Sequence, residues 1–262
     1  MTTTTETHPA TVLITGASRR IGRAVAIDFA RRGWRVGIHY RRSRAEAETL
    51  AMQLRELGTE AEPLAADLAI GADVSALVPR CRDALGAPIC LINNASEFHF
   101  DTAATVTPNF WDLHHNVNLK APVFLAQALL AHLPEAQEGN VINIIDQRVW
   151  NPTPEFFSYT ISKAGLWTAT RMLAQALAPR VRVNAIGPGP VLPSVHQRAE
   201  DFEAEKNSTL LRRGASPEDI AAAVRFILDA PAMTGQMIAL DGGQHLTWPS
   251  AERGASSAGR KR

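Results

Sequence analysis

Tyr159 and Lys163, which stand four residues apart in the stretch SYTISKAG, form a pair that can transfer protons. Residues at this spacing share one face of a helix. A free phenol has a pKa of about 10 and is a poor acid or base at neutral pH. A neighbouring ammonium group lowers that pKa because it favours the phenolate. The pair therefore predicts general acid–base chemistry.

Asp146 is a second candidate, because the stretch NVINIID places it at the end of apolar, β-branched residues typical of a buried strand. A carboxylate there is costly unless it has a partner or a function. Two interpretations stay open. Asp146 can share in proton transfer with Tyr159, in which case the two groups titrate as a coupled set. Alternatively, it can cap the loop formed by residues 147–157.

The third chemical feature is a glycine turn near the start of the chain, in TVLITGASRRIGRAV. Gly16 permits a tight turn, and Gly22 allows the following helix to pack close to a sheet. The backbone amides at the start of that helix then face an anion, favourably a pyrophosphate. Two glycines alone are a weak signal, but their place after the first predicted strand indicates a dinucleotide site.

The elements that must position these residues are short apolar runs alternating with helical patterns. Strands are predicted at residues 11–15, 35–40, 62–67, 89–94, 140–145, 180–186 and 236–241. Helices are predicted between nearly all of them, for example at residues 20–32, 45–57, 73–85 and 218–230. This alternation predicts an α/β protein with one doubly wound parallel sheet.

The same patterns predict a single domain covering residues 10–248. Residues 1–9 and the basic tail at 249–262 contain few apolar side chains, and we expect both to be disordered. The connection from Gly187 to about Ala215 is the one long segment without a periodic pattern, and a loop of that length favours a functional lid.

Composition argues against several classes of function. The chain is 45% hydrophobic and 20% charged with a net charge of +1, so we expect neither nucleic acid nor a membrane as its partner. No apolar run approaches the roughly 20 residues that span a bilayer, and the first residues lack a secretory signal. Cys81 and Cys90 are interpreted as buried free thiols, and neither they nor the pair His114–His115 predicts a metal site. We expect a cytoplasmic protein.

Four motifs together resemble the short-chain dehydrogenase/reductase family: TGASRRIG, NNAS (residues 93–96), YTISK (159–163) and NAIGPG (184–189). The resemblance implies a single-domain Rossmann fold with a seven-stranded sheet flanked by helices. It also implies a bound nicotinamide dinucleotide and a homotetramer built through long helices, including the one that bears Tyr159.

The family resemblance assigns roles to three residues. It implies that Tyr159 donates or accepts the proton, and that Lys163 tunes Tyr159 and also holds the nicotinamide ribose. Asn118, in VNLKAP, would support Lys163 through a bound water.

The stretch HYRRS, after the second predicted strand, indicates which dinucleotide is preferred. Proteins that prefer NAD tend to have an acid here, which bonds the ribose hydroxyls and repels an added phosphate. Arg41, Arg42 and Ser43 instead offer two cations and a hydroxyl, which suit the 2′-phosphate of NADPH. The alternative is that the arginines solvate the start of a helix, although arginine opposes the helix dipole there.

Within the family, the chain resembles the pteridine reductases, including the bacterial dihydromonapterin reductases. Arg20 stands where a glycine is usual, and NNAS replaces the commoner NNAG. Phe98 follows shortly after, and Asp146 takes the place of a serine that orients a carbonyl substrate. The resemblance implies that Phe98 stacks on the pterin, and that Arg20 and Ser96 contact both cofactor phosphate and pterin. Arg20 can instead be the first exposed residue of a helix, and Phe98 a loop aromatic packed on the fold.

The predicted function is an NADPH-dependent reductase that transfers a hydride to the C=N bond of a pterin: dihydromonapterin, dihydrobiopterin or a dihydrofolate-like compound. A carboxyl group suits this reaction, because it can relay the proton that the ring nitrogen needs. One alternative is a carbonyl reductase of the same fold, acting on 3-oxoacyl or ketone substrates. A more remote alternative is a non-catalytic dinucleotide sensor.

The predicted site residues fall into three sets. The catalytic residues are Asp146, Tyr159, Lys163 and Asn118. The substrate-binding residues are Arg20, Ser96, Phe98, Asp146 and Tyr159. The cofactor-binding residues are Gly16, Ser18, Arg19, Arg20, Ile21, Tyr40, Arg41, Arg42, Ser43, Asp67, Leu68, Asn94, Ala95, Ser96, Lys163, Pro188, Gly189 and Val191. Among these, family resemblance makes Asp67 the acceptor for the adenine amino group. Trp150, Phe156 and Phe157 can wall an apolar pocket, or can be core or subunit contacts.

Overall fold

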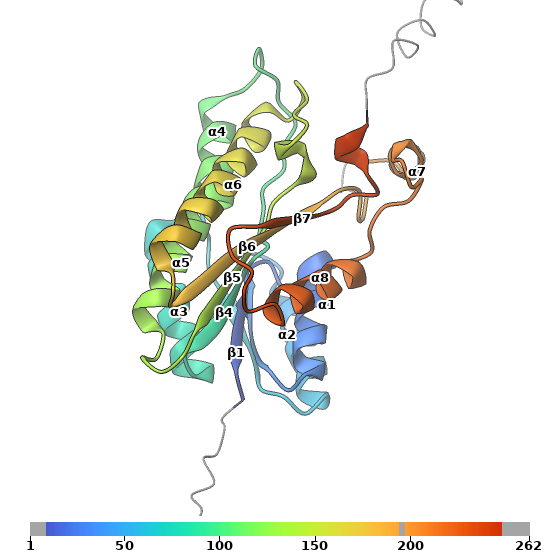
Figure 1. The fold of residues 1–262 in the computed structure, drawn as a ribbon. Helices are drawn as coiled ribbons and strands as arrows, with labels where there is room; N and C mark the ends of the chain where they lie inside the picture. The colour runs from blue at the N-terminus through green and yellow to red at the C-terminus, as the bar shows by residue number, and fades with distance from the viewer. Residues whose placement is uncertain (1–8, 194–196, 248–262) are drawn as a thin grey trace, which may run out of the picture.

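The fold is built on one sheet of seven parallel strands in the order β3-β2-β1-β4-β5-β6-β7 (Figure 1). The computed structural model describes residues 9–193 and 197–247. The strands are β1 Thr11–Ile14, β2 Arg35–Tyr40, β3 Ala61–Ala65, β4 Pro88–Asn93, β5 Gly139–Ile144, β6 Val181–Pro188 and β7 Met237–Leu240. The predicted doubly wound α/β sheet is therefore confirmed, with small differences at the strand ends.

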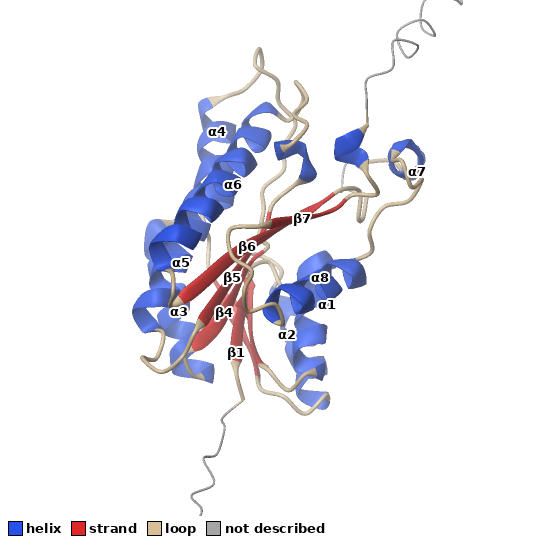
Figure 2. Ribbon diagram, viewed as in Figure 1, coloured by secondary structure: helices blue, strands red, loops and turns tan. Residues whose placement is uncertain are grey.

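Helices cover both faces of the sheet (Figure 2). The helices on one face are α1 (Arg20–Arg31), α2 (Arg44–Glu56) and α8 (Pro217–Leu228). Those on the other are α3 (Gly71–Leu85), α4 (Pro108–His115), α5 (Ala121–His132) and α6 (Phe157–Leu177). Each face of the sheet has its own hydrophobic core. Val12 and Ile14 of β1 pack in the core under α1, α2 and α8, and Leu13 packs in the core on the opposite face. Because both faces are buried, the strand is a continuous apolar run in the sequence.

The glycine turn lies where the strand order reverses, between β1 and β4. In open α/β sheets, ligands bind in the crevice at such a point, outside the carboxyl ends of the strands. Gly16 has a φ of 62°, in the left-handed region, and a Cβ on Gly22 would lie 2.3 Å from the Gly16 carbonyl oxygen. The close approach of α1 to the turn therefore requires both glycines.

A π-helical turn, Asn116–Lys120, joins α4 to α5 and packs against α6. Such turns occur frequently at functional sites. Here the turn places Asn118 beside the first turns of α6, which carry Tyr159 and Lys163.

The prediction of an irregular connection from Gly187 to Ala215 is wrong in part. β6 continues to Pro188, and α7 (Ala199–Ser208) occupies the middle of the segment. α7 buries only Phe202, and it carries surface ion pairs such as Arg198–Asp201, at 2.9 Å. A helix without an apolar stripe has no periodic signal in the sequence.

Smaller features also compare with expectation. Ser216 caps α8 through a reciprocal bond with Asp219, and Cys81 and Cys90 are buried free thiols. Apart from the exposed residue Pro9, the segments predicted to be disordered lie outside the described residues. Within the described part of the chain, we find no helix with the length and apolar character needed to cross a membrane.

Candidate active site

A cavity of about 530 Å³ lies at the carboxyl ends of β1, β2, β3 and β4. Most of the predicted cofactor-binding residues line it: Gly16, Ser18, Arg19, Arg20, Ile21, Tyr40, Arg41, Arg42, Ser43, Asp67, Leu68, Asn94, Ala95 and Ser96. Three further lining residues were not predicted: His39, Glu97 and Val117. The predicted residues Lys163, Pro188, Gly189 and Val191 lie outside this cavity, toward β5 and β6.

The loop after β4 is tied directly to the glycine turn. Asn94 Nδ2 donates to the carbonyl oxygens of Thr15 and Gly16, at 2.9 and 3.1 Å. The Thr15 hydroxyl in turn accepts from the backbone amides of Asn94 and Ala95. The NNAS motif therefore fixes the shape of the turn as well as lining the cavity.

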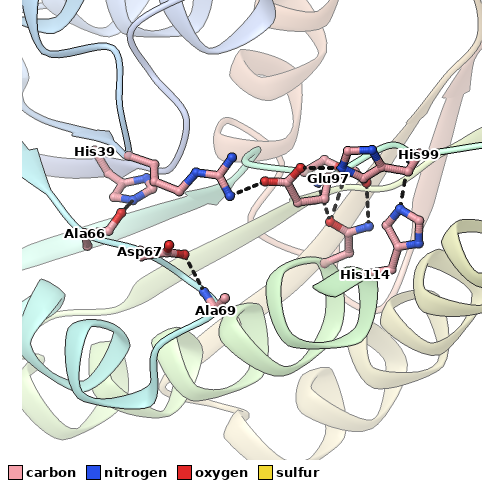
Figure 3. A network of polar contacts seen from close by, with 10 residues as sticks. His39, Ala66, Asp67, Ala69, Glu97, His99 and His114 are labelled. Atoms are coloured by element: carbon pink, nitrogen blue, oxygen red, sulfur yellow. Dashed lines mark hydrogen bonds and ion pairs between the residues drawn. The ribbon is translucent and has the colours of Figure 1, made fainter. Parts of the chain in front are cut away.

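His39 braces the same turn from the side of β2, and Figure 3 shows its contact with Ala66. Its Nδ1 accepts from the Gly16 amide at 3.0 Å, and its Nε2 lies 3.1 Å from the Ala66 carbonyl oxygen. The two partners place the proton on Nε2. Burial lowers the pKa of His39 to about 4, so the ring is neutral at physiological pH. Nothing in the local sequence indicates this role, because both partners come from other strands.

Asp67 lies at the rim of the cavity, after β3. Its Oδ1 accepts from the Ala69 amide at 3.0 Å (Figure 3). Its own amide donates to Asp73 at 2.7 Å. These bonds hold the residue against the start of α3. Its role as acceptor for the adenine amino group stays a prediction.

The two arginines after β2 differ in their surroundings. Arg41 forms an ion pair with Glu97, whereas Arg42 has no ion pair or hydrogen bond among the described residues. Beside them, the hydroxyls of Ser43 and Ser18 lie 2.7 Å apart. Of the two arginines predicted to bind the 2′-phosphate, Arg41 is therefore already paired with a carboxylate, whereas Arg42 keeps a free guanidinium among the described residues.

Arg20 adopts a left-handed backbone conformation with a φ of 55°, at the position where a glycine is expected. Its guanidinium donates to the carbonyl oxygens of Pro193 and Leu192, at 2.7 and 3.0 Å. Burial, with the neighbouring charge of Arg19, lowers the pKa of Arg20 from its usual value. Arg20 thus connects the glycine turn to the segment after β6, in addition to lining the cavity.

Asp146 takes part in both of the interactions that the sequence left open. It lies two residues beyond β5, where its Oδ2 accepts from the Tyr159 hydroxyl at 2.9 Å. Its Oδ1 accepts from the Arg148 amide at 2.8 Å, which caps a short 3₁₀ turn, Gln147–Val149. One carboxylate therefore fixes the loop and also accepts a hydrogen bond from the Tyr159 phenol.

The expected lowering of the Tyr159 pKa by Lys163 is not observed. Burial and the carboxylate of Asp146 raise the pKa of Tyr159 well above its usual value. Burial also raises the pKa of Asp146 and lowers that of Lys163 to about 8. The Lys163 ammonium donates to the Ile144 carbonyl at 2.9 Å, whereas the carboxylate contacts the phenol directly. Tyr159 consequently holds its proton at neutral pH.

Asn118 is buried and connects the β4 loop to α6. Its Oδ1 accepts from the Glu97 amide at 2.8 Å and from the Ser96 hydroxyl at 3.2 Å. Its Nδ2 donates to the Glu97 carbonyl and to the Ser162 hydroxyl. No direct bond joins it to Lys163 among the described residues, so support through a water stays a prediction.

An aromatic cluster covers the Tyr159 side of the site. Phe98 stacks on Phe156 with ring centroids 4.3 Å apart, and its ring meets that of Tyr159 edge-on at 4.7 Å. Phe98 is still 37% exposed, so it packs on the fold and keeps accessible ring surface. Trp150, in contrast, packs against His245.

A buried polar group at the start of α6 was missed by the sequence. Phe156 precedes the helix and offers no side-chain cap, and Asp101 replaces it by accepting from the Ser158 amide at 3.1 Å and from the Ser158 hydroxyl. His114 Nδ1 lies 2.7 Å from the same hydroxyl, and its Nε2 accepts from the His99 amide. His114 is fully buried in this network.

Comparison with known proteins places this geometry in a family. The model of the short chain dehydrogenase family matches residues 10–204. A Brucella suis structure, FolM alternative dihydrofolate reductase 1 in complex with NADP, is 48% identical, with a TM-score of 0.90 over 93% of this chain and 98% of that one. Its Brucella canis counterpart is 47% identical, with a TM-score of 0.88 over 93% and 97% of the two chains.

A second kind of relative has another activity in its name. The 3-oxoacyl-[acyl-carrier-protein] reductase FabG of Staphylococcus epidermidis is 28% identical over 89% of this chain and 98% of its own length. This chain belongs to the short-chain dehydrogenase family and is an oxidoreductase.

Proposed function

We propose that this protein is an NADPH-dependent reductase of a pterin C=N bond, with dihydromonapterin, dihydrobiopterin or a dihydrofolate-like compound as substrate. The observation that carries the proposal is the bond between Tyr159 and the carboxylate of Asp146, beside the partly exposed ring of Phe98. The similarity to two FolM alternative dihydrofolate reductases supports it.

The proposed cofactor site follows the cavity at the carboxyl ends of the strands. The turn at Gly16 would hold the pyrophosphate, and Arg42 with Ser43 would bind the 2′-phosphate. Both FolM structures contain NADP, which supports this choice. Binding measurements should therefore favour NADPH over NADH, and Arg42→Asp should reverse the preference. Equal affinity of the wild type for both would contradict the proposed phosphate site.

The proposed mechanism depends on the protonation states of Tyr159 and Asp146. Bound NADPH supplies the hydride that goes to a ring carbon of the pterin. Tyr159, kept protonated by burial and by Asp146, donates the proton that the ring nitrogen requires. Asp146, whose pKa is raised by burial, can then take up a proton from solvent and pass it to the phenolate. Lys163 would hold the nicotinamide ribose, as in the family.

A carbonyl reductase is the second candidate, and the similarity to FabG favours it. A ketone needs a single donor to its oxygen, which Tyr159 can supply without Asp146. A pterin carries ring and amino N–H groups that a carboxylate can accept. We therefore expect Asp146 to favour the pterin.

An assay of NADPH oxidation with dihydropterins, dihydrofolate and a panel of ketones and 3-oxoacyl thioesters separates these candidates. The proposal predicts turnover of at least one dihydropterin or dihydrofolate. Turnover of the ketones or thioesters alone would establish the carbonyl reductase. Binding of NADPH without any turnover would favour a dinucleotide sensor.

We also propose a homotetramer. Large apolar side chains on three surface helices support it: Phe124 on α5, Met172 on α6 and Phe226 on α8 are exposed in the single chain.

A further inference from the structure

The ion pair between Arg41 and Glu97 crosses the cofactor cavity. Arg41 follows β2 and Glu97 follows β4, and β1 lies between these two strands in the sheet. Both residues line the cavity of about 530 Å³. The pair therefore spans the carboxyl end of β1, where the glycine turn begins.

Glu97 is held in place from several sides, as Figure 3 shows. Its side chain is only 15% exposed, and its second carboxylate oxygen lies 3.1 Å from His99 Nε2. Its backbone amide and carbonyl both bond to the Asn118 side chain, at 2.8 and 3.0 Å. The carboxylate is therefore a fixed anchor, and it decides where the longer and more exposed side chain of Arg41 points.

Arg42, the next residue, provides the contrast. It has no partner among the described residues, and it lies beside the paired hydroxyls of Ser43 and Ser18. A guanidinium that already shares its charge with a carboxylate gains less from a phosphate, since the two anions repel each other across it. An unpaired guanidinium keeps its full attraction for a phosphate dianion.

We propose that Glu97 determines how strongly this protein distinguishes NADPH from NADH, by holding Arg41 away from the 2′-phosphate. Arg42, Ser43 and Ser18 then form the phosphate site, and Arg41 contributes similarly to both dinucleotides. This inference rests on the proposed use of NADPH. Removing the carboxylate frees Arg41 to bind the phosphate, so the preference for NADPH increases.

The test is a cycle of four proteins: wild type, Glu97→Gln, Arg41→Ala and the double variant. Dissociation constants for NADPH and NADH are measured on each by titration of the reduced-nicotinamide fluorescence, without a substrate. Glutamine keeps the size of the side chain and both backbone bonds to Asn118. Thermal unfolding verifies that each variant is folded, and Glu97→Ser replaces the glutamine variant if that protein is unstable.

With Arg41 present, Glu97→Gln should increase the NADPH preference by about fivefold, the upper range for a partly exposed ion pair. With Arg41 replaced by alanine, the same substitution should leave the preference unchanged. Two results would overturn the proposal: an unchanged preference in the first case, or an equal increase in both. The second result would mean that Glu97 repels the phosphate directly.

Glu48→Gln is the matched control. Glu48 pairs with Arg44 on the exposed surface of α2 at 2.7 Å and does not line the cavity. The Glu48→Gln substitution removes the same unit of charge at a position away from the cavity, so the preference for NADPH should not change. A shift equal to that of Glu97→Gln would also refute the proposal. Failure of the proposed NADPH use is distinguishable, because it appears in the wild type as equal affinity for both dinucleotides.

Discussion

The bond from Tyr159 to Asp146 determines which protonation states the site can use. In the single chain the phenol is neutral, because its neighbour is an anion and water is excluded. A neutral phenol is the form that reduction of a C=N bond requires, since the ring nitrogen must receive a proton. Asp146 favours this neutral form, and in the proposed reaction it also offers a route by which a proton can return to the phenolate.

Tyr159→Phe removes the proton donor and leaves the ring that packs against Phe98. We expect turnover to fall by a factor of about 10² to 10⁴, the usual range for general acid catalysis. The dissociation constant of NADPH should stay near that of the wild type, because Tyr159 does not line the dinucleotide cavity. Steady-state kinetics and cofactor titration measure the two effects. Undiminished turnover would refute the role of Tyr159.

Asp146→Asn tests the buried carboxyl group through pH. Burial raises the pKa of Asp146 in the folded protein, so the folded state holds this proton more tightly than the unfolded chain. Ionisation of Asp146 therefore subtracts stability as the pH rises above about 4. The melting temperature of the variant, relative to the wild type, should therefore increase as the pH rises above about 4. The variant should also turn over more slowly than the wild type. A pH-independent difference in melting temperature would contradict the shift.

At the scale of elements, the first turn of α6 is positioned from outside the helix. Phe156, the residue before the helix, has a left-handed φ of 53° and provides no cap. Asp101 instead accepts a hydrogen bond from the backbone amide of Ser158. A carboxylate at a helix N-terminus also complements the helix dipole. The direction of Tyr159 therefore depends on a loop more than 50 residues earlier in the chain, since Asp101 and Ser158 are 57 residues apart.

Asp101→Ala should lower the free energy of unfolding by about 1 to 2 kcal/mol, the range for a lost helix cap. It should also reduce kcat more than it changes the KM for NADPH, because Ser158, which Asp101 caps, is next to Tyr159 in the helix. Ser216→Ala is the control, since it removes the cap of α8. Urea unfolding should show a comparable loss for both variants, with kcat reduced only by the first. Unchanged kcat in Asp101→Ala would show that the cap does not position Tyr159.

The turn from β1 into α1 carries backbone strain at Arg20, whose φ of 55° costs about 1 to 2 kcal/mol for a residue with a side chain. Arg20→Gly and Arg20→Ala both lose the guanidinium bonds to Leu192 and Pro193. Only glycine relieves the strain. Chemical denaturation should therefore give the glycine variant about 1 kcal/mol more stability than the alanine variant. Equal stability of the two would mean that the turn rearranges when the bonds are lost.

At the scale of the whole molecule, α6 carries both a proposed catalytic residue and an exposed apolar side chain. The same helix carries Tyr159 in its buried first turn and Met172, which is 64% exposed, further along. Phe226, on α8, is 56% exposed on the other layer. Large apolar side chains exposed on helices of both layers favour association with further copies.

Light scattering should give the mass of a tetramer for the wild type. Met172→Asp and Phe226→Asp each place a charge in one proposed contact, so each should reduce the assembly to smaller species. Met52→Asp is the control and should leave the mass unchanged, because Met52 is exposed on α2, a helix outside the proposed contacts. A monomeric wild type would refute the proposed tetramer.

Short stretches of the sequence were enough to predict the sheet, the glycine turn and the placement of Tyr159 and Lys163 on one helix. These features depend on apolar periodicity, on backbone freedom at Gly16 and on the absence of a side chain at Gly22, which short stretches of sequence specify. α7 escaped prediction because its residues are nearly all exposed and leave no apolar period. The sequence predicted that Asp146 lies at the end of a strand, but it did not show whether the carboxylate caps the loop or bonds to Tyr159. In the structure it does both.

The electrostatics of the site depend on contacts that form only when the chain folds. The brace from His39 to Gly16, the cap from Asp101 to Ser158 and the pair of Arg41 with Glu97 each join residues distant in the sequence. The sequence also predicted the wrong direction for the Tyr159 pKa. Spacing along a helix identified a cation nearby, whereas burial and the carboxylate at 2.9 Å determine the charge. Protonation depends on distance and on excluded water, and folding fixes both.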